Sequence, residues 1–202
     1  MTGALLASLT EVARDLELIG ARWALIGGFA VSARAEPRFT RDVDICVVAE
    51  SDTSAELLTQ ALLGLGYTVD ALVEHERVGR LATVRLVSPI PGGVLVDLLF
   101  ASSGIEDEIV SSADELEIAA DLVVPVATAA HLVVLKLLAR DDRTRPQDQM
   151  DLLALRRTLS PDDEAEVRRC SALVTKRGFN RDRDLTAAAQ AYLADDAGAV
   201  SS

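Results

Sequence analysis

Two aspartates separated by one residue, Asp42 and Asp44, are the chemically most informative feature of this sequence. They lie in the segment Asp42-Val43-Asp44-Ile45, in which acids alternate with apolar residues, as at the start of a strand. Because side chains alternate along a strand, both carboxylates are expected on the same face. Two carboxylates on a buried strand repel each other and lose hydration, so a cation is the expected compensation. The spacing therefore predicts a site for one or two divalent ions.

A glycine pair, Gly27-Gly28, precedes the aspartates and is separated from them by thirteen residues. It follows a short apolar run that is expected to be a strand, and a short helix is predicted between the pair and Pro37. Glycine lets the backbone approach a ligand closely, and the first N–H groups of a helix are free to bind phosphate oxygens. A glycine pair alone is common in tight turns. In combination with the Asp-x-Asp segment it is much more specific, and it predicts a site for a phosphate-bearing ligand.

A single lysine, Lys136, interrupts the apolar run HLVVLKLLAR, which is predicted to be a helix capped by Thr128. A lone ammonium there needs either a route to solvent or an anionic partner, and a triphosphate is a candidate partner. Asp148 and Asp151 follow one turn apart on another predicted helix. These two acids are either part of the same site or ordinary acids on the surface of a helix.

The elements that must position these residues follow from the hydrophobic periodicity. The pattern predicts an α/β part of about 125 residues followed by a helical part, that is, a mixed sheet with flanking helices and a helical cap. The turn SPIPGG predicts that the last two strands form a hairpin, and a short acidic helix is expected after it. Helix caps are predicted within 52–54, at Ser160 before Pro161, and at Asn180. The predicted strands cover 23–26, 43–48, 67–73, 81–87 and 94–100.

Composition limits the classes of protein that fit. The chain has 202 residues, half of them apolar, which is enough for one domain or one domain with a small appendage. The division expected is residues 1–125 and residues 126–202. Its two cysteines, Cys46 and Cys170, are far apart and suggest neither a disulfide framework nor a zinc ribbon. There is no basic leader and no apolar run long enough to cross a bilayer, so a cytoplasmic protein without a membrane partner is expected.

Charge and histidine content narrow the function further. The net charge of -12 argues against polyanionic partners on average, but the excess of acids lies mainly in residues 1–130 (20 against 8), whereas residues 131–184 are mildly basic (12 against 10). The arginines of that second part either dock a phosphate-bearing partner or are solvated helix faces. His75 and His131 have no Ser or Cys nucleophile motif beside them, which argues against a histidine-dependent hydrolase. His131 is expected to pack in the helical part.

The order of these motifs resembles the polymerase-β-like nucleotidyltransferase superfamily: a hydrophobic strand, Gly-Gly, a variable helix, and then Asp-x-Asp between apolar residues. The longer run Arg38-Phe39-Thr40-Arg41-Asp42-Val43-Asp44 resembles the Arg-x-Thr-x-Asp-x-Asp string of the AbiEii/MenT-type toxin nucleotidyltransferases and of related antibiotic nucleotidyltransferases. The resemblance covers roughly residues 20 to 155. It implies an α+β nucleotidyltransferase fold followed by a C-terminal helical bundle.

The resemblance also implies roles for further residues. A third carboxylate on a neighbouring strand is expected to bind metal and activate the acceptor hydroxyl, and GVLVDLLF supplies Asp97. Arg38 and Thr40 are expected to contact the nucleotide. The family pairs a lysine such as Lys136 with a helical aspartate, often within Lys-Asp-x-x-Asp. Here Gln147 replaces the second lysine, which leaves both aspartates as candidates, Asp151 before Asp148.

The implied activity is Mg²⁺-dependent transfer of a nucleoside monophosphate from a nucleoside triphosphate. For a toxin of a toxin–antitoxin system the implied acceptor is the 3′ end of tRNA, with a cognate antitoxin as a partner. A small-molecule acceptor, as in antibiotic modification, and a protein hydroxyl are alternatives within the same class. A catalytically silent nucleotide-binding relative is the alternative outside it. Retention of Asp42, Asp44 and Asp97 favours the enzyme.

Overall fold

A seven-stranded mixed sheet with helices on both faces forms the centre of the structure, a computed structural model that describes residues 3–75, 79–140 and 146–194. The helices are α1 (Gly3–Ile19), α2 (Gly27–Arg34), α3 (Asp52–Gly64), α4 (Glu106–Ser111), α5 (Ala129–Ala139), α6 (Pro146–Arg156), α7 (Pro161–Lys176) and α8 (Leu185–Ala194). The strands are β1 (Trp23–Ile26), β2 (Asp42–Val47), β3 (Thr68–His75), β4 (Arg80–Val87), β5 (Leu95–Leu99), β6 (Asp114–Ala119) and β7 (Leu122–Val126). None of the helices in these ranges is long and apolar enough to cross a bilayer.

The order of the strands, β3-β4-β5-β2-β1-β7-β6, places β2 at the centre of the sheet. It runs parallel to β5 and antiparallel to β1, whereas β1 runs parallel to β7. The predicted hairpin is confirmed, since β4 and β5 pair antiparallel across the SPIPGG turn. A mixed sheet is thus built around the strand that carries the Asp-x-Asp segment.

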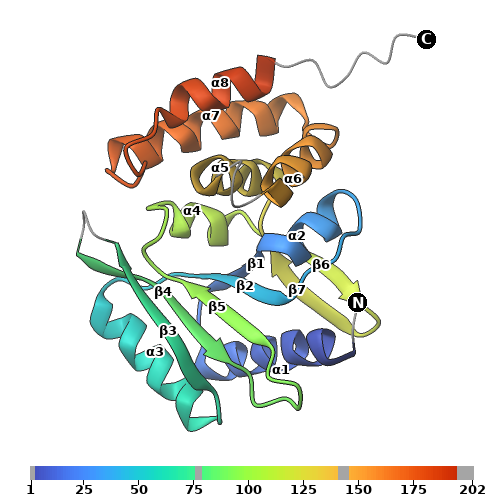
Figure 1. The fold of residues 1–202 in the computed structure, drawn as a ribbon, viewed down its shortest axis with the longest axis vertical. Helices are drawn as coiled ribbons and strands as arrows, with labels where there is room; N and C mark the ends of the chain where they lie inside the picture. Colours follow the sequence, from blue (N-terminus) through green and yellow to red (C-terminus); the bar gives the residue numbers. More distant parts are fainter. Residues whose placement is uncertain (1–2, 76–78, 141–145, 195–202) are drawn as a thin grey trace.

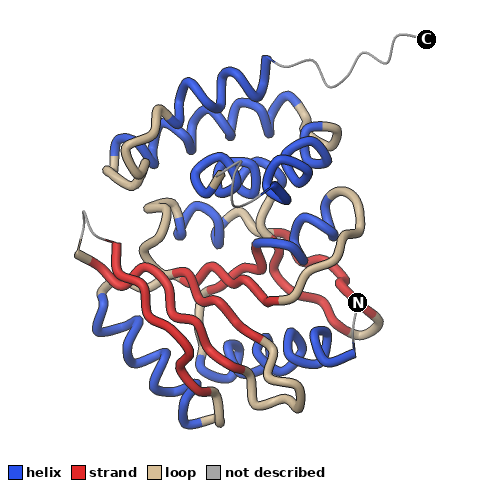
Figure 2. The backbone as a smooth tube through the Cα atoms, in the orientation of Figure 1, coloured by secondary structure: helices blue, strands red, loops and turns tan. Residues whose placement is uncertain are grey.

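The two faces of the sheet are covered by different helices. Figures 1 and 2 show α1 and α3 on one side, and α4 with the helices α5 to α8 on the other. Alternation of side chains along β2 explains this arrangement. Val43, Ile45 and Val47 point to one face and are fully buried. The helix α1, whose buried residues include Leu9 and Leu16, packs against this strand. The opposite face, which carries Asp42 and Asp44, lies on the side of α2 and α4.

Three local expectations were wrong. The first turn of α3 includes Asp52, and its cap is Ser51, whose side chain accepts the N–H of Ser54. Segment 114–126, which was not predicted as strand, forms the β6–β7 hairpin at the sheet edge. Asn180 does not cap a helix; α8 begins at Leu185, and Asp184 accepts the N–H of Ala187.

The C-terminal helices are held together mainly by α5. Eight of its eleven residues are buried, and it packs against α2, α6, α7 and α8. Its predicted cap is confirmed, since Thr128 accepts the N–H of His131, and Ser160 forms the predicted cap of α7 before Pro161. Because α5 contacts α2 as well as the other C-terminal helices, it joins the helical part to the sheet. The division at residue 125 remains a prediction.

Candidate active site

Three carboxylates, those of Asp42, Asp44 and Asp97, meet on one face at the centre of the sheet. Asp42 and Asp44 belong to β2, and the parallel register sets Asp44 directly beside Asp97 of β5. Each residue offers an oxygen, and these oxygens all lie within 4.8 Å of one another. Residues far apart in the sequence are thus brought together by strand pairing, in the arrangement that the sequence predicted.

The charge of this cluster is not balanced by the protein alone. Burial, together with the nearby charges of Asp42 and Asp97, raises the pKa of Asp44 to about 7. Lys136 and the backbone N–H of Gly28 act in the opposite direction without cancelling that effect. Near neutral pH, Asp44 is therefore only partly ionised when no cation is bound to the cluster.

The residues present fit a hard divalent cation. All three side chains offer oxygen donors, which Mg²⁺ prefers, and a cation between them would relieve the repulsion that raises the pKa of Asp44. Asp42, Asp44 and Asp97 are the groups that would hold it.

The glycine pair is required by the protein's own side chains. Gly27 has φ +65°, and a Cβ there would lie 1.9 Å from Oδ2 of Asp44. A Cβ on Gly28 would lie 2.6 Å from Oγ1 of Thr40. The backbone N–H of Gly28 is hydrogen-bonded to Asp44. The pair therefore lets the turn between β1 and α2 lie directly against the carboxylate cluster.

Thr40 and Arg38 connect this turn to its surroundings. The hydroxyl of Thr40 donates to Oδ1 of Asp42 over 3.2 Å, which restrains that carboxylate. The guanidinium of Arg38 forms an ion pair with Asp151 of α6, with Nε 2.7 Å from Oδ1 and Nη2 3.0 Å from Oδ2. Both residues of the Arg-x-Thr string thus lie at the site. Thr40 is hydrogen-bonded to the carboxylate cluster, and Arg38 is paired with Asp151 of α6.

Arg85 is a residue of the site that the sequence reading missed. It lies on β4 opposite Asp97, and its guanidinium donates to both carboxylate oxygens of Asp97, each over 2.7 Å. The antiparallel register of the hairpin creates this pair. Counting back along both strands from the predicted SPIPGG turn would have placed the two residues side by side.

Lys136 has its anionic partners within the protein. Its ammonium lies 2.7 Å from Oδ1 of Asp148 and 2.8 Å from Oδ2 of Asp151. Asp151 is almost fully buried and also contacts Arg38 and the side-chain amide of Gln147. From the sequence, Lys136 needed either a route to solvent or an anionic partner, with a triphosphate as the candidate partner; the structure supplies two carboxylates.

A cavity joins the two halves of the site. Gly27 and Asp44 line it from the sheet, and Lys136 and Asp148 line it from the helices. Its volume of about 110 Å³ is below the roughly 300 Å³ at which small-molecule sites begin. A bound nucleotide must therefore extend beyond it, or α6 must move.

We expect Lys136→Met to lower the free energy of unfolding, because it leaves Asp148 and Asp151 without their shared cation. Breaking a buried ion pair typically costs about 3–5 kcal/mol, and Arg38 remains on Asp151, so the lower end applies. Chemical denaturation would measure the loss. Lys136→Met combined with Asp148→Asn should recover part of it, and equal stability of wild type and the single variant would show that the lysine does not hold these acids in solution.

Comparison with known proteins supplies a family. The sequence profile described as "Nucleotidyl transferase AbiEii toxin, Type IV TA system" matches residues 12–199. No curated protein sequence matches this chain.

Among solved structures, similar chains include an antigenic nucleotidyltransferase-like protein from Paracoccidioides brasiliensis, with 19% identity, a TM-score of 0.56 and coverage of 94% of both chains. The antibiotic-resistance factor ANT(2″)-Ia has 16% identity and a TM-score of 0.49, with 95% of this chain and 92% of that chain covered. The nucleotidyltransferase toxin MenT4 from Mycobacterium tuberculosis has 19% identity and a TM-score of 0.44, with 84% and 64% covered. The first of these likenesses supports the nucleotidyltransferase fold.

Proposed function

Because the chain belongs to the AbiEii family, the nucleotidyl transferase toxins of type IV toxin–antitoxin systems, we propose that it transfers a nucleoside monophosphate from a nucleoside triphosphate to the 3′ end of tRNA in a Mg²⁺-dependent reaction. The observation that supports the transfer is the cluster of Asp42, Asp44 and Asp97 beside the Gly27-Gly28 turn. The tRNA acceptor is what the resemblance to the AbiEii/MenT-type toxins implies. A cognate antitoxin is the protein partner that such a toxin implies.

The chain's own residues hold the reacting groups in place. The N–H of Gly28 fixes Asp44, the hydroxyl of Thr40 fixes Asp42, and Arg85 holds both oxygens of Asp97. Bound Mg²⁺ would supply stabilisation of negative charge on the attacking and leaving oxygens. Asp97 lies on the strand next to that of Asp44, and we assign to it the activation of the acceptor hydroxyl.

The helical side of the site supplies positive charge for the triphosphate. Lys136 lines the same cavity as Asp44, so a triphosphate bound at the cluster would come within its reach. The ammonium of Lys136 must then either bind phosphate in addition to Asp148 and Asp151 or release these carboxylates and bind phosphate in their place. Asp151 remains paired to Arg38 during such an exchange, whereas among the contacts described Asp148 has only Lys136 as a cationic partner.

The transfer is tested by following labelled nucleotide to its acceptor. The protein is incubated with Mg²⁺ and each of the four α-labelled triphosphates, together with tRNA, a protein extract or a pool of small hydroxylated compounds. We expect label in tRNA. Periodate treatment of the tRNA beforehand destroys the terminal diol, so treated tRNA should accept no label.

Two controls separate the parts of the proposal. The Asp42→Asn/Asp44→Asn variant should transfer nothing to any acceptor. Label in protein or in a small molecule, with none in tRNA, would retain the transferase and overturn the tRNA assignment. No transfer by the wild-type protein to any acceptor, under conditions in which it binds the triphosphate, would instead support a silent nucleotide-binding relative.

A further inference from the structure

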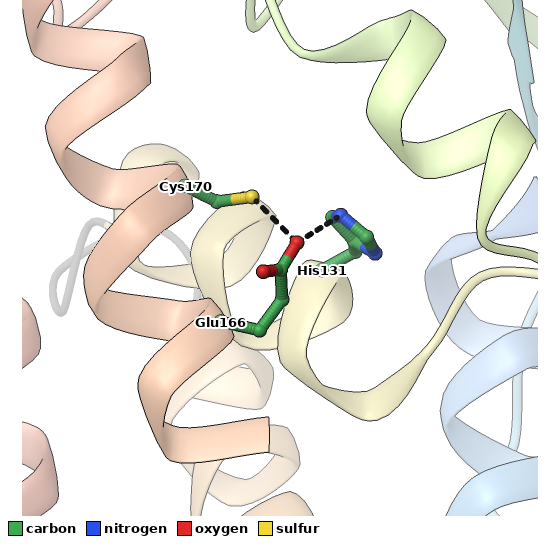
Figure 3. Close-up of side chains that lie close together, drawn as sticks. All are labelled: His131, Glu166 and Cys170. Atoms are coloured by element: carbon green, nitrogen blue, oxygen red, sulfur yellow. Dashed lines mark hydrogen bonds and ion pairs between the residues drawn. The ribbon is translucent and has the colours of Figure 1, made fainter. Parts of the chain in front are cut away.

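A second group of metal-binding side chains lies in the helical part, away from the carboxylate cluster. His131 of α5 faces Glu166 and Cys170, which lie one turn apart on α7. Figure 3 shows the imidazole, the carboxylate and the thiol directed toward one another across the interface of the two helices. Each residue offers one ligand atom, and these atoms all lie within 4.8 Å of one another.

The imidazole of His131 is oriented but incompletely bonded. Its Nδ1 lies 2.8 Å from the hydroxyl of Thr128, the residue that caps α5. The ring is fully buried, and Nε2 has no hydrogen-bond partner in the described part of the chain. It lies 3.4 Å from Oε1 of Glu166, longer than the distance of a good hydrogen bond. A buried nitrogen of this kind requires an explanation, because an unsatisfied polar atom costs free energy.

Two of the three distances between the ligand atoms match those around a tetrahedral metal ion, and the third, between Nε2 of His131 and Sγ of Cys170, is within 4.8 Å. Ligand bonds of about 2.0–2.3 Å in tetrahedral geometry place the ligand atoms about 3.3–3.7 Å apart. Here Nε2 of His131 is 3.4 Å and Sγ of Cys170 is 3.3 Å from the same carboxylate oxygen, Oε1 of Glu166. The hydroxyl of Thr128 holds the second ring nitrogen and so fixes the orientation of the imidazole, the part that a carboxylate, a carbonyl or a water plays for most metal-bound histidines.

We propose that His131, Glu166 and Cys170 form a binding site for Zn²⁺ that ties α5 to α7. One nitrogen, one carboxylate oxygen and one sulfur are a ligand set that suits Zn²⁺ and not Mg²⁺. Cys170 would bind as the thiolate, releasing its proton to solvent. Glu166 is the partly exposed member of the group, so the ion enters and a water completes the tetrahedron from that side.

Arg169 is a cation that contacts two members of this group, Glu166 and Cys170. Its Nη2 lies 2.6 Å from Oε1 of Glu166, and its Nε lies 2.7 Å from Oε2. About half of the Arg169 side chain is exposed, so Nη2 can leave Oε1 for solvent while Nε keeps Oε2. The arginine would then support the metal-bound carboxylate from outside. Because α5 also carries Lys136, a metal ion here would fix the helix that reaches the candidate active site.

Cobalt substitution distinguishes this site from the three aspartates. Co²⁺ bound by a thiolate gives a sulfur-to-metal charge-transfer band in the near ultraviolet, which an all-oxygen site cannot give. We expect reduced, chelator-stripped, full-length protein to show this band with one Co²⁺ per chain, and Zn²⁺ to remove the band by displacement. The Asp42→Asn/Asp44→Asn variant, which lacks the oxygen site, should behave in the same way.

Matched variants assign the ligands. Cys170→Ser should abolish the band, and Cys46→Ser, which removes the other buried thiol, should retain it. Glu166→Gln should weaken Co²⁺ binding by about 10-fold or more, and its partial exposure makes it the variant in which folding is least affected. Circular dichroism would confirm the fold of each variant. Absence of the band from the wild type, or its survival in Cys170→Ser, would overturn the proposal and leave the three residues as a hydrogen-bonded contact between helices.

Discussion

Asp44→Asn is expected to stabilise the metal-free protein while abolishing nucleotidyl transfer. The substitution keeps the size of the side chain and an oxygen for the N–H of Gly28, but it removes one of three neighbouring negative charges. Loss of a group that supports a metal ligand costs about 10–100-fold in activity, so loss of a ligand itself should lower transfer by more than about 100-fold. Calorimetric titration with Mg²⁺ and triphosphate should show much weaker binding than in the wild type.

The sign of the stability change follows from the pKa of Asp44. In the folded protein this pKa is about 7, above the usual aspartate value of 3.8, so the folded state binds more protons than the unfolded state between these values. Wild-type stability therefore falls as the pH rises from about 4 to 7 and remains low above that range. Asp44→Asn lacks this loss, so the variant should match the wild type near pH 4 and exceed it at pH 8.

The rise in the pKa of Asp44 from 3.8 to about 7 corresponds to a gain of up to about 4 kcal/mol at pH 8 without Mg²⁺. A gain of this size raises the melting temperature by about 8–16 °C. Saturating Mg²⁺ should stabilise the wild type and not the variant. The difference in stability between the two proteins should therefore become smaller or change sign. Glu56→Gln, at an exposed acid on α3, serves as the control and should change none of these measurements. A variant that is less stable than the wild type at pH 8 would contradict the description of Asp44 as a strained, uncompensated charge.

The part of the site that could be predicted from the sequence is the local part. Gly27, Gly28, Asp42 and Asp44 fall within one strand–helix–strand segment, and strand alternation alone places the two aspartates on one face. The β4–β5 hairpin was predictable as well, because SPIPGG is a strong turn signal. In each case a short stretch of chain contains the whole signal.

What was missed depends on pairing between segments. Arg85 is an ordinary strand residue in the sequence, and it is found only when the register of β4 on β5 is counted back from the SPIPGG turn. The sequence left Lys136 with either a route to solvent or an anionic partner, and the docking of α6 on α5 decides that its partners are Asp148 and Asp151. Tertiary contacts of this kind leave no periodicity to read.

The β6–β7 hairpin was missed for a compositional reason. β6 carries Asp114, Glu115 and Glu117, and acids are depleted in strands. β7 contains Pro125, which argues against a strand in the interior of a sheet. In the structure β6 is the edge strand, where exposed acids protect against further pairing, and Pro125 lies opposite Glu115 of that edge.

Asp97→Asn is expected to impair the chemical step far more than the binding of nucleotide. Asp97 lies beside Asp44 on the neighbouring parallel strand, so it belongs to the cluster, but it reaches the site from the side opposite the Gly27-Gly28 turn. Asparagine preserves its size and still accepts one hydrogen bond from Arg85, whose side chain is 40% exposed and can place its remaining charge in solvent. The fold should therefore survive, and triphosphate should still bind through Asp42, Asp44 and Lys136.

A metal ligand or proton acceptor at the acceptor hydroxyl acts mainly in the transition state, and its loss typically lowers the rate by about 10²–10⁴-fold. Single-turnover transfer measured at saturating triphosphate separates this effect from binding, since only the rate should fall. Arg85→Gln is the matched control: it leaves the Asp97 carboxylate in place and removes the group that orients it, so a smaller loss of about 10–100-fold is expected. If Asp97→Asn transferred label at close to the wild-type rate while Asp42→Asn did not, the reaction would depend on the two carboxylates of β2 alone. Asp97 would then be the structural partner of Arg85, and Arg85→Gln should change stability without changing the rate.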